Sequence, residues 1–199
     1  MALKYAVNNS LSAITTLPSS ISGGALNLIS TQTASASASL EFSLDDSYDS
    51  YVFKFINCHP QNDNVQLTFN GSIDNGSNYN VTKTTTFFRP FHNEADTISG
   101  LSYDGGFDLA QSTAYQPISQ QTGNDNDQNC SGYMQLFNPN SSIFVKHYIS
   151  RLSNIQHSDT AVDDFSAGYF NTTSPITNLK FQMSSGNIDD GIIKMYGVS

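Results

Sequence analysis

The stretch ITNLKFQMSSGNIDDGIIKMYGV, residues 176–198, decides the fold class. In its first half Leu179, Phe181 and Met183 alternate with polar residues, and in its second half apolar residues flank Lys194 in the same way. A period of two is typical of a β-strand with one face in water and the other in a core. The Ser, Gly, Asn and Asp residues between the halves are typical of a turn. The stretch therefore predicts two β-strands joined as a hairpin.

The same kind of pattern recurs along most of the chain. It predicts strands over residues 26–31, 40–44, 51–57, 65–70, 82–89, 131–137, 143–149 and 165–171. Residues 33–39 are small and predict a connection. Residues 51–57 are apolar on both faces except for Lys54, and this pattern favours a strand in the middle of a sheet. About ten strands at regular spacing, without a βαβ pattern, predict an all-β fold. We expect a jelly-roll-like antiparallel β-sandwich, with a seven-stranded immunoglobulin-like domain as the alternative.

Residues 91–129 form a long segment with weak periodicity. A segment of this length is either functional or contains hidden elements, and short strands at 97–103 and 113–119 or a helical turn at 108–115 are the candidates. Three of its aromatic residues, Tyr103, Phe107 and Tyr115, lie well outside the main strands. They are the candidates for a surface that binds a glycan, although core or subunit-contact roles are the commoner use of such residues.

The first residues differ in composition from the rest of the chain. Residues 1–24 are rich in Ser, Thr and Asn and contain isolated apolar residues, namely Leu11, Ile14, Leu17 and Ile21. A frayed terminus is one interpretation, and an extended arm that lies on a neighbouring subunit is the one we favour. The predicted organisation is therefore an arm over residues 1–24 and a β-sandwich domain over residues 25–199.

Composition limits the class of partner. The chain has 199 residues and a net charge of −9, and only 13% of its residues are charged. Phosphate recognition needs clustered Lys and Arg, so a nucleic-acid partner is not expected. No stretch has the apolar core of a secretory signal or the length of a membrane span, and no membrane partner is expected either.

No motif requires catalysis or a cofactor. Cys58 and Cys130 lack a second nearby cysteine, which favours two free buried thiols over a disulfide. The oxygen-rich run Asn124–Asn129 lacks the Gly and the distal Glu of an EF-hand loop, so a polar turn is the first interpretation and loosely bound calcium the alternative. The chain has two Glu residues, and no nucleophile motif is present. We expect a protein that is not an enzyme and has no metal or cofactor.

Ser72, Asp74, Gly76 and Tyr79 have the spacing of an Asp-box, Ser-x-Asp-x-Gly-x-Thr-Trp, with Tyr in place of Trp. Asp side chains accept hydrogen bonds from the backbone of their own turn, and Gly allows a positive φ. This box is a folding element rather than an active site, and it predicts a structural hairpin.

Several phrases together resemble a group of small virion proteins of tailed bacteriophages, many of them marine. They are NNSLSAITTLP, LISTQTASASASLEF, YVFKFINCHPQNDNVQL, GNDNDQNCSG, LFNPNSSIFVKHYI and FQMSSGNIDDGIIKMYGVS. The resemblance extends over most of the chain and brings no catalytic residue with it. It implies a particle component located in the virion and made in the host cytoplasm, where cysteines stay reduced.

The resemblance implies two modes of action. The first is a head-decoration protein that attaches to other virion proteins through the arm and forms a homo-oligomer. The second is a tail or fibre module that binds a receptor or glycan of the host surface. A glycan-cleaving enzyme is the least expected function, because it needs facing carboxylates in a groove.

Overall fold

The computed structural model describes residues 26–198, and all of its regular structure in this range is β-strand. The strands are β1 (Asn27–Ser37), β2 (Leu40–Ser43), β3 (Ser50–Pro60), β4 (Leu67–Ser72), β5 (Lys83–Asn93), β6 (Ser99–Tyr103), β7 (Gln116–Pro117), β8 (Cys130–Phe137), β9 (Lys146–Gln156), β10 (Thr160–Phe170), β11 (Asn178–Met183) and β12 (Ile188–Val198). No helix in this range is long and apolar enough to cross a membrane. The predicted all-β fold class is confirmed.

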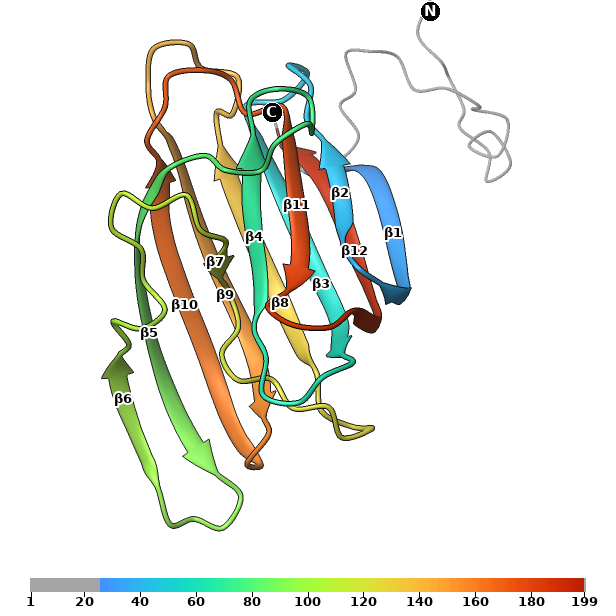
Figure 1. Cartoon of the computed structure of the whole chain (residues 1–199), viewed down its shortest axis with the longest axis vertical. Coiled ribbons are helices and arrows are strands. Elements are labelled where there is room, and N and C mark those ends of the chain that lie inside the picture. The colour runs from blue at the N-terminus through green and yellow to red at the C-terminus, as the bar shows by residue number, and fades with distance from the viewer. Residues whose placement is uncertain (1–25, 199) are drawn as a thin grey trace, which may run out of the picture.

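The strands form two antiparallel sheets that pack face to face (Figure 1). The larger sheet has eight strands in the order β1-β12-β3-β8-β9-β10-β5-β6, and the smaller has four in the order β2-β11-β4-β7. This arrangement is a β-sandwich, as predicted, whereas its jelly-roll character stays a prediction. The immunoglobulin-like alternative is wrong, because twelve strands in the described range exceed the seven that it requires.

The closing stretch forms two strands, but the predicted hairpin is wrong. β11 pairs with β2 and β4 in the smaller sheet, whereas β12 pairs with β1 and β3 in the larger one. The turn between them therefore carries the chain from one sheet to the other. It is held by hydrogen bonds to the segment before β4: Ser184 N–H donates to the carbonyl of Gln66, and Gln61 N–H donates to the carbonyl of Asn187.

The core lies between the two sheets and centres on Phe181 of β11. This ring is fully buried and contacts four others, with centroid distances of 5.2 Å to Phe53 and Phe55, 6.0 Å to Phe42 and 6.2 Å to Phe69. Phe53 and Phe55 belong to the larger sheet and Phe42 and Phe69 to the smaller one. Aromatic contacts therefore join the two layers.

Four local predictions differ from the structure. Strand β1 continues through the small residues to Ser37, which pairs with Ile188 of β12. Strand β9 begins at Lys146, because the Ser141 hydroxyl accepts hydrogen bonds from the N–H groups of Ile143 and Phe144 and holds them in a turn. The Asp-box forms a turn closed on Asp74, but it leads from β4 to β5 of the other sheet and is not a hairpin. The helical turn expected at 108–115 is absent from the described residues.

The core also contains ionisable groups. Lys83 of β5 has no exposed surface, and its Nζ donates to Asn70 Oδ1 at 2.7 Å and to the Val81 carbonyl at 2.8 Å. Burial lowers the pKa of Lys83 to about 7. Asp164 of β10 is also fully buried; its Oδ2 accepts from Gln120 N–H, and burial raises its pKa to about 8.

Candidate functional site

The larger sheet has a second face, turned away from the core, that the smaller sheet does not cover (Figure 1). Successive strand residues point to opposite sides, so each strand of this sheet supplies side chains to both faces. In β5, Phe87 is fully buried while Phe88 is 41% exposed. In β8, Met134 is buried while Tyr133 is 37% exposed. We call this second face the outer face.

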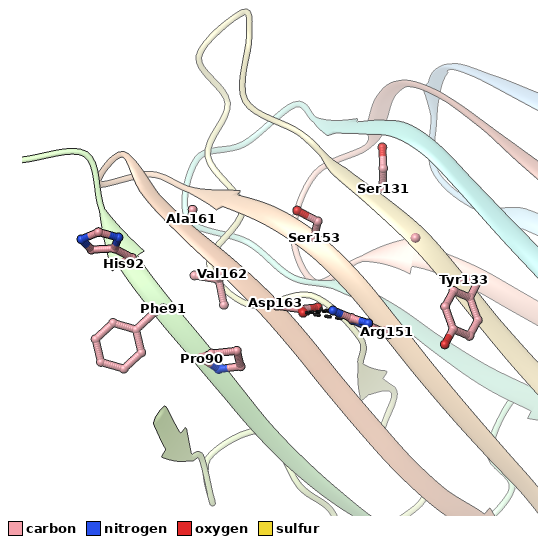
Figure 2. A pocket seen from close by; sticks show the side chains of 11 residues that line it. Pro90, Phe91, His92, Ser131, Tyr133, Arg151, Ser153, Ala161, Val162 and Asp163 are labelled. Carbon is pink, nitrogen blue, oxygen red and sulfur yellow. Dashed lines mark hydrogen bonds and ion pairs between the residues drawn. The ribbon is translucent and has the colours of Figure 1, made fainter. Parts of the chain in front are cut away.

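The outer face contains an open cleft of about 580 Å³ over β5, β10, β9 and β8. Its polar lining includes Ser131, Arg151, Ser153 and Asp163, and Tyr133 forms part of its wall (Figure 2). This volume is within the range of small-molecule sites, roughly 300–1,000 Å³. We take this cleft as the candidate functional site.

Arg151 and Asp163 form an ion pair in the middle of the cleft. Asp163 Oδ2 accepts from Arg151 Nη2 at 2.6 Å, and both Asp163 oxygens accept from Nε at 3.0 Å (Figure 2). The hydrogen bonds and charge of Asp163 raise the pKa of Arg151, so the guanidinium stays protonated. A guanidinium has five N–H donors, and Nη1 forms no hydrogen bond with any residue of the described range. The pair therefore offers donors and acceptors side by side to a ligand.

Aromatic rings hold this ion pair in place. The Arg151 guanidinium lies 5.0 Å from the ring centroid of Phe165, and Phe165 stacks on Phe88 with a centroid distance of 4.7 Å and an interplanar angle of 6°. Tyr133 is directly opposite Arg151 in the β8–β9 register. A second cleft of about 240 Å³ lies beside these residues and shares Tyr133 and Arg151 with the first.

The cleft offers charged, polar and aromatic side chains to a ligand. Asp163 is the one carboxylate among the described residues that line it. Glycoside hydrolysis ordinarily uses two carboxyl groups on either side of the scissile bond. Vicinal hydroxyl groups can instead be held by a planar guanidinium and a carboxylate, while an exposed ring packs on the apolar face of a sugar.

The structure separates the three aromatic residues that the sequence singled out. Tyr103 of β6 is 58% exposed and lies directly opposite Phe88, on the outer face. Phe107 instead packs on the buried ring of Phe87, with a centroid distance of 5.5 Å. Tyr115 is half-buried, and its pKa is raised first by burial and then by the charge of Glu41 on β2. Only Tyr103 of the three joins the outer face.

Other predicted features lie elsewhere. Leu11, Ile14, Leu17 and Ile21 are outside the described residues, so the arm stays a prediction. Cys58 and Cys130 are directly opposite each other in β3 and β8 as buried free thiols.

The run Asn124–Asn129 forms a turn in which Gln128 N–H donates to the carbonyl of Asp125. The Gln128 amide also donates to the carboxylate of Asp159 at 3.0 Å. Within residues 26–198 no three His, Cys, Asp or Glu side chains are grouped as metal ligands would be.

The outer-face residues Phe88, Tyr133, Arg151 and Phe165 were not predicted from the sequence as a site. Their aromatic members lie inside predicted strands, where rings are expected to fill the core. The available signal was the neighbouring pair Phe87 and Phe88, because adjacent residues of a strand point to opposite faces. One ring of such a pair must therefore leave the core.

We compared the chain with known protein families, curated protein sequences and solved structures, and none of them gave a significant match. The resemblance to tailed-phage virion proteins therefore stays a prediction. The geometry of the outer face is the basis on which a function can be proposed.

Proposed function

We propose that this protein is a non-enzymatic component of a tailed-phage virion that binds a glycan of the host surface through the outer face of its larger sheet. The observation that carries the binding function is the exposed cleft in which Tyr133 lies opposite the Arg151–Asp163 ion pair. The virion setting comes from the sequence resemblance alone. Sandwich folds of this general kind are used both in virus particles and in lectins.

The cleft matches the requirements of a sugar better than those of a purely apolar ligand. Its centre is an ion pair whose Arg151 and Asp163 side chains are 54% and 27% exposed, so water already solvates part of each group. A sugar hydroxyl can replace that water without leaving a charge unpaired. An apolar ligand would instead bury the ion pair without new hydrogen bonds, which is costly.

Attachment to a capsid through residues 1–24 is compatible with this function. The arm and the outer face belong to different parts of the chain, so one can fix the protein to the particle while the other binds the host. The predicted homo-oligomer would then present several copies of the cleft, and weak single sites would combine into strong attachment.

The test is binding of the full chain to a panel of bacterial surface polysaccharides, measured by calorimetry. Tyr133→Ala and Arg151→Ala are expected to weaken binding about tenfold each, since each removes one stacking or charge-assisted contact of about 1.5 kcal/mol. The matched control is Phe144→Ala, which removes a ring that is 68% exposed in the loop before β9 and does not line the cleft. Unchanged binding by both cleft variants, or no binding to any member of the panel, would contradict the proposal.

A further inference from the structure

The cleft is part of a longer row of side chains that crosses the sheet. Seven strands that are neighbours in the larger sheet, namely β12, β3, β8, β9, β10, β5 and β6, each contribute one cationic or aromatic residue at the same register position. In sheet order the row is Lys194, Lys54, Tyr133, Arg151, Phe165, Phe88 and Tyr103. Directly opposite residues lie on the same face, so all seven side chains belong to the outer face. With neighbouring strands about 4.8 Å apart, the row is about 29 Å long.

Three pairs of neighbours in the row contact one another: Lys54 with Tyr133, Arg151 with Phe165, and Phe165 with Phe88. The Nζ of Lys54 lies 5.4 Å from the ring centroid of Tyr133, and Arg151 and Phe165 form the equivalent pair at 5.0 Å. Cation–π contacts and ring stacking restrict the side chains before any ligand arrives. The ordering cost of binding is correspondingly smaller.

Clefts lie on both sides of the row. The cleft of about 580 Å³ follows its Asp163 side, and the cleft of about 240 Å³ follows the side of Ile149 and Ala167. Tyr133 and Arg151 line both clefts. A ligand that packs on these two residues can therefore continue along the row in either direction, which fits a chain better than a single sugar.

The row has an unbalanced positive charge at one end. Lys54 and Lys194 are directly opposite each other on adjacent strands, and like charges in this position repel. Among residues 26–198 no carboxylate forms an ion pair with either lysine. The chain as a whole has a net charge of −9 and only eight Lys and Arg residues, three of which lie in this row. An anionic group between the two lysines would relieve their repulsion.

We propose that this row is the binding track for an extended anionic polysaccharide, which runs across the strands with its sugar rings on the aromatic half and a carboxylate at Lys54 and Lys194. The proposal rests on the proposed function and names the class of glycan. A single-stranded nucleic acid is the other polymer that combines rings with negative charge. Bases bind by stacking on open ring faces, and Phe88 and Phe165 turn their faces toward each other with a centroid distance of 4.7 Å, which disfavours a nucleic acid on this part of the row.

The test uses the full chain and a series of oligogalacturonates from the monosaccharide to the octasaccharide, with carboxyl-reduced oligosaccharides of the same lengths. We expect the affinity to rise with length until the row is filled. Carboxyl reduction and the Lys54→Gln/Lys194→Gln double variant should each weaken binding of the octasaccharide by at least about tenfold, the value of one charge-assisted contact. Lys180→Gln is the matched control, because Lys180 also lies over a tyrosine ring, that of Tyr79, but in the smaller sheet.

The outcomes separate the two proposals. If the reduced oligosaccharides bind equally well while Tyr133→Ala abolishes binding, the anionic track is overturned and the glycan site stands. If the monosaccharide binds as tightly as the octasaccharide, the ligand occupies one cleft and the track is again overturned. If a single-stranded oligonucleotide binds more tightly than every oligosaccharide, the occupant is a nucleic acid. If no oligosaccharide binds in either form, the anionic track is overturned, and binding to the panel of surface polysaccharides decides separately whether the glycan site stands.

Discussion

Replacement of Phe181 by Ala should remove a large part of the stability of the sandwich. Phe181 has no exposed surface and contacts two rings from each sheet. Large-to-small replacement of a buried Phe costs about 3–5 kcal/mol, because it combines lost transfer free energy with a cavity. The loss of four ring contacts places Phe181→Ala near the upper end, at about 4–5 kcal/mol, against a total stability of roughly 5–15 kcal/mol for a domain.

The assay is urea denaturation followed by far-ultraviolet circular dichroism, since the chain contains no Trp for fluorescence. Two controls separate the causes. Phe181→Leu keeps most of the volume and should cost about 1–1.5 kcal/mol. Phe165→Ala removes a ring from the outer face, where no second sheet covers it, and should cost about 1 kcal/mol. A loss below about 2 kcal/mol for Phe181→Ala, or an equal loss for Phe165→Ala, would refute the assignment of Phe181 as the residue that joins the layers.

Two further predictions concern buried ionisable groups, and a third concerns a glycine of β8. Asp164 keeps its proton in the folded protein up to about pH 8 but loses it near pH 4 when unfolded, so its contribution to stability falls as pH rises through this window. Asp164→Asn should reduce the difference in unfolding free energy between pH 5 and pH 8, measured by urea denaturation. An unchanged difference would count against a neutral Asp164. Lys83 has the opposite effect, because the folded protein releases the Lys83 proton near pH 7 and the unfolded chain near pH 10, so stability rises with pH between these values. Lys83→Met should abolish this rise in denaturation curves. A rise that persists in the variant would have to come from another group. Gly132→Ala should prevent the native pairing of β8 with β9, because the added Cβ would lie 2.2 Å from the carbonyl oxygen of Arg151. A variant with the native circular dichroism spectrum and melting temperature would contradict this, because the two strands would then have to accommodate the Cβ at no cost in stability.

The sequence was sufficient to predict strands wherever one face is polar. In β2 the apolar residues are buried and the polar residues exposed, and in β11 the apolar residues are buried and the polar residues half-buried. It was not sufficient to predict partners. The pattern from Ile176 to Val198 is the same whether its two strands pair with each other or with strands of different sheets, because the period of two specifies a buried face and not the neighbour. The pattern therefore predicted a hairpin, whereas β11 and β12 pair with strands of different sheets.

The outer-face row was beyond sequence reasoning for a related reason. Its residues are distributed from Lys54 to Lys194, and they meet only because six strand pairings have registers that bring them into line. A shift of one residue in any of these pairings would send one part of the row into the core. Tyr103 was identified because it lies in a segment of weak periodicity, whereas Tyr133 and Phe165 lie inside regular strands.

The crossing of the chain between sheets at residues 184–187 has a consequence for synthesis on the ribosome. Before residues 178–198 emerge, β1 has no link to β3 and β2 has no link to β4, so both layers are incomplete in the same nascent chain. Strand edges that will later be paired are then open to other chains. We therefore expect both layers of the sandwich to be completed only after these residues emerge, and the incomplete nascent chain to be the state most open to aggregation.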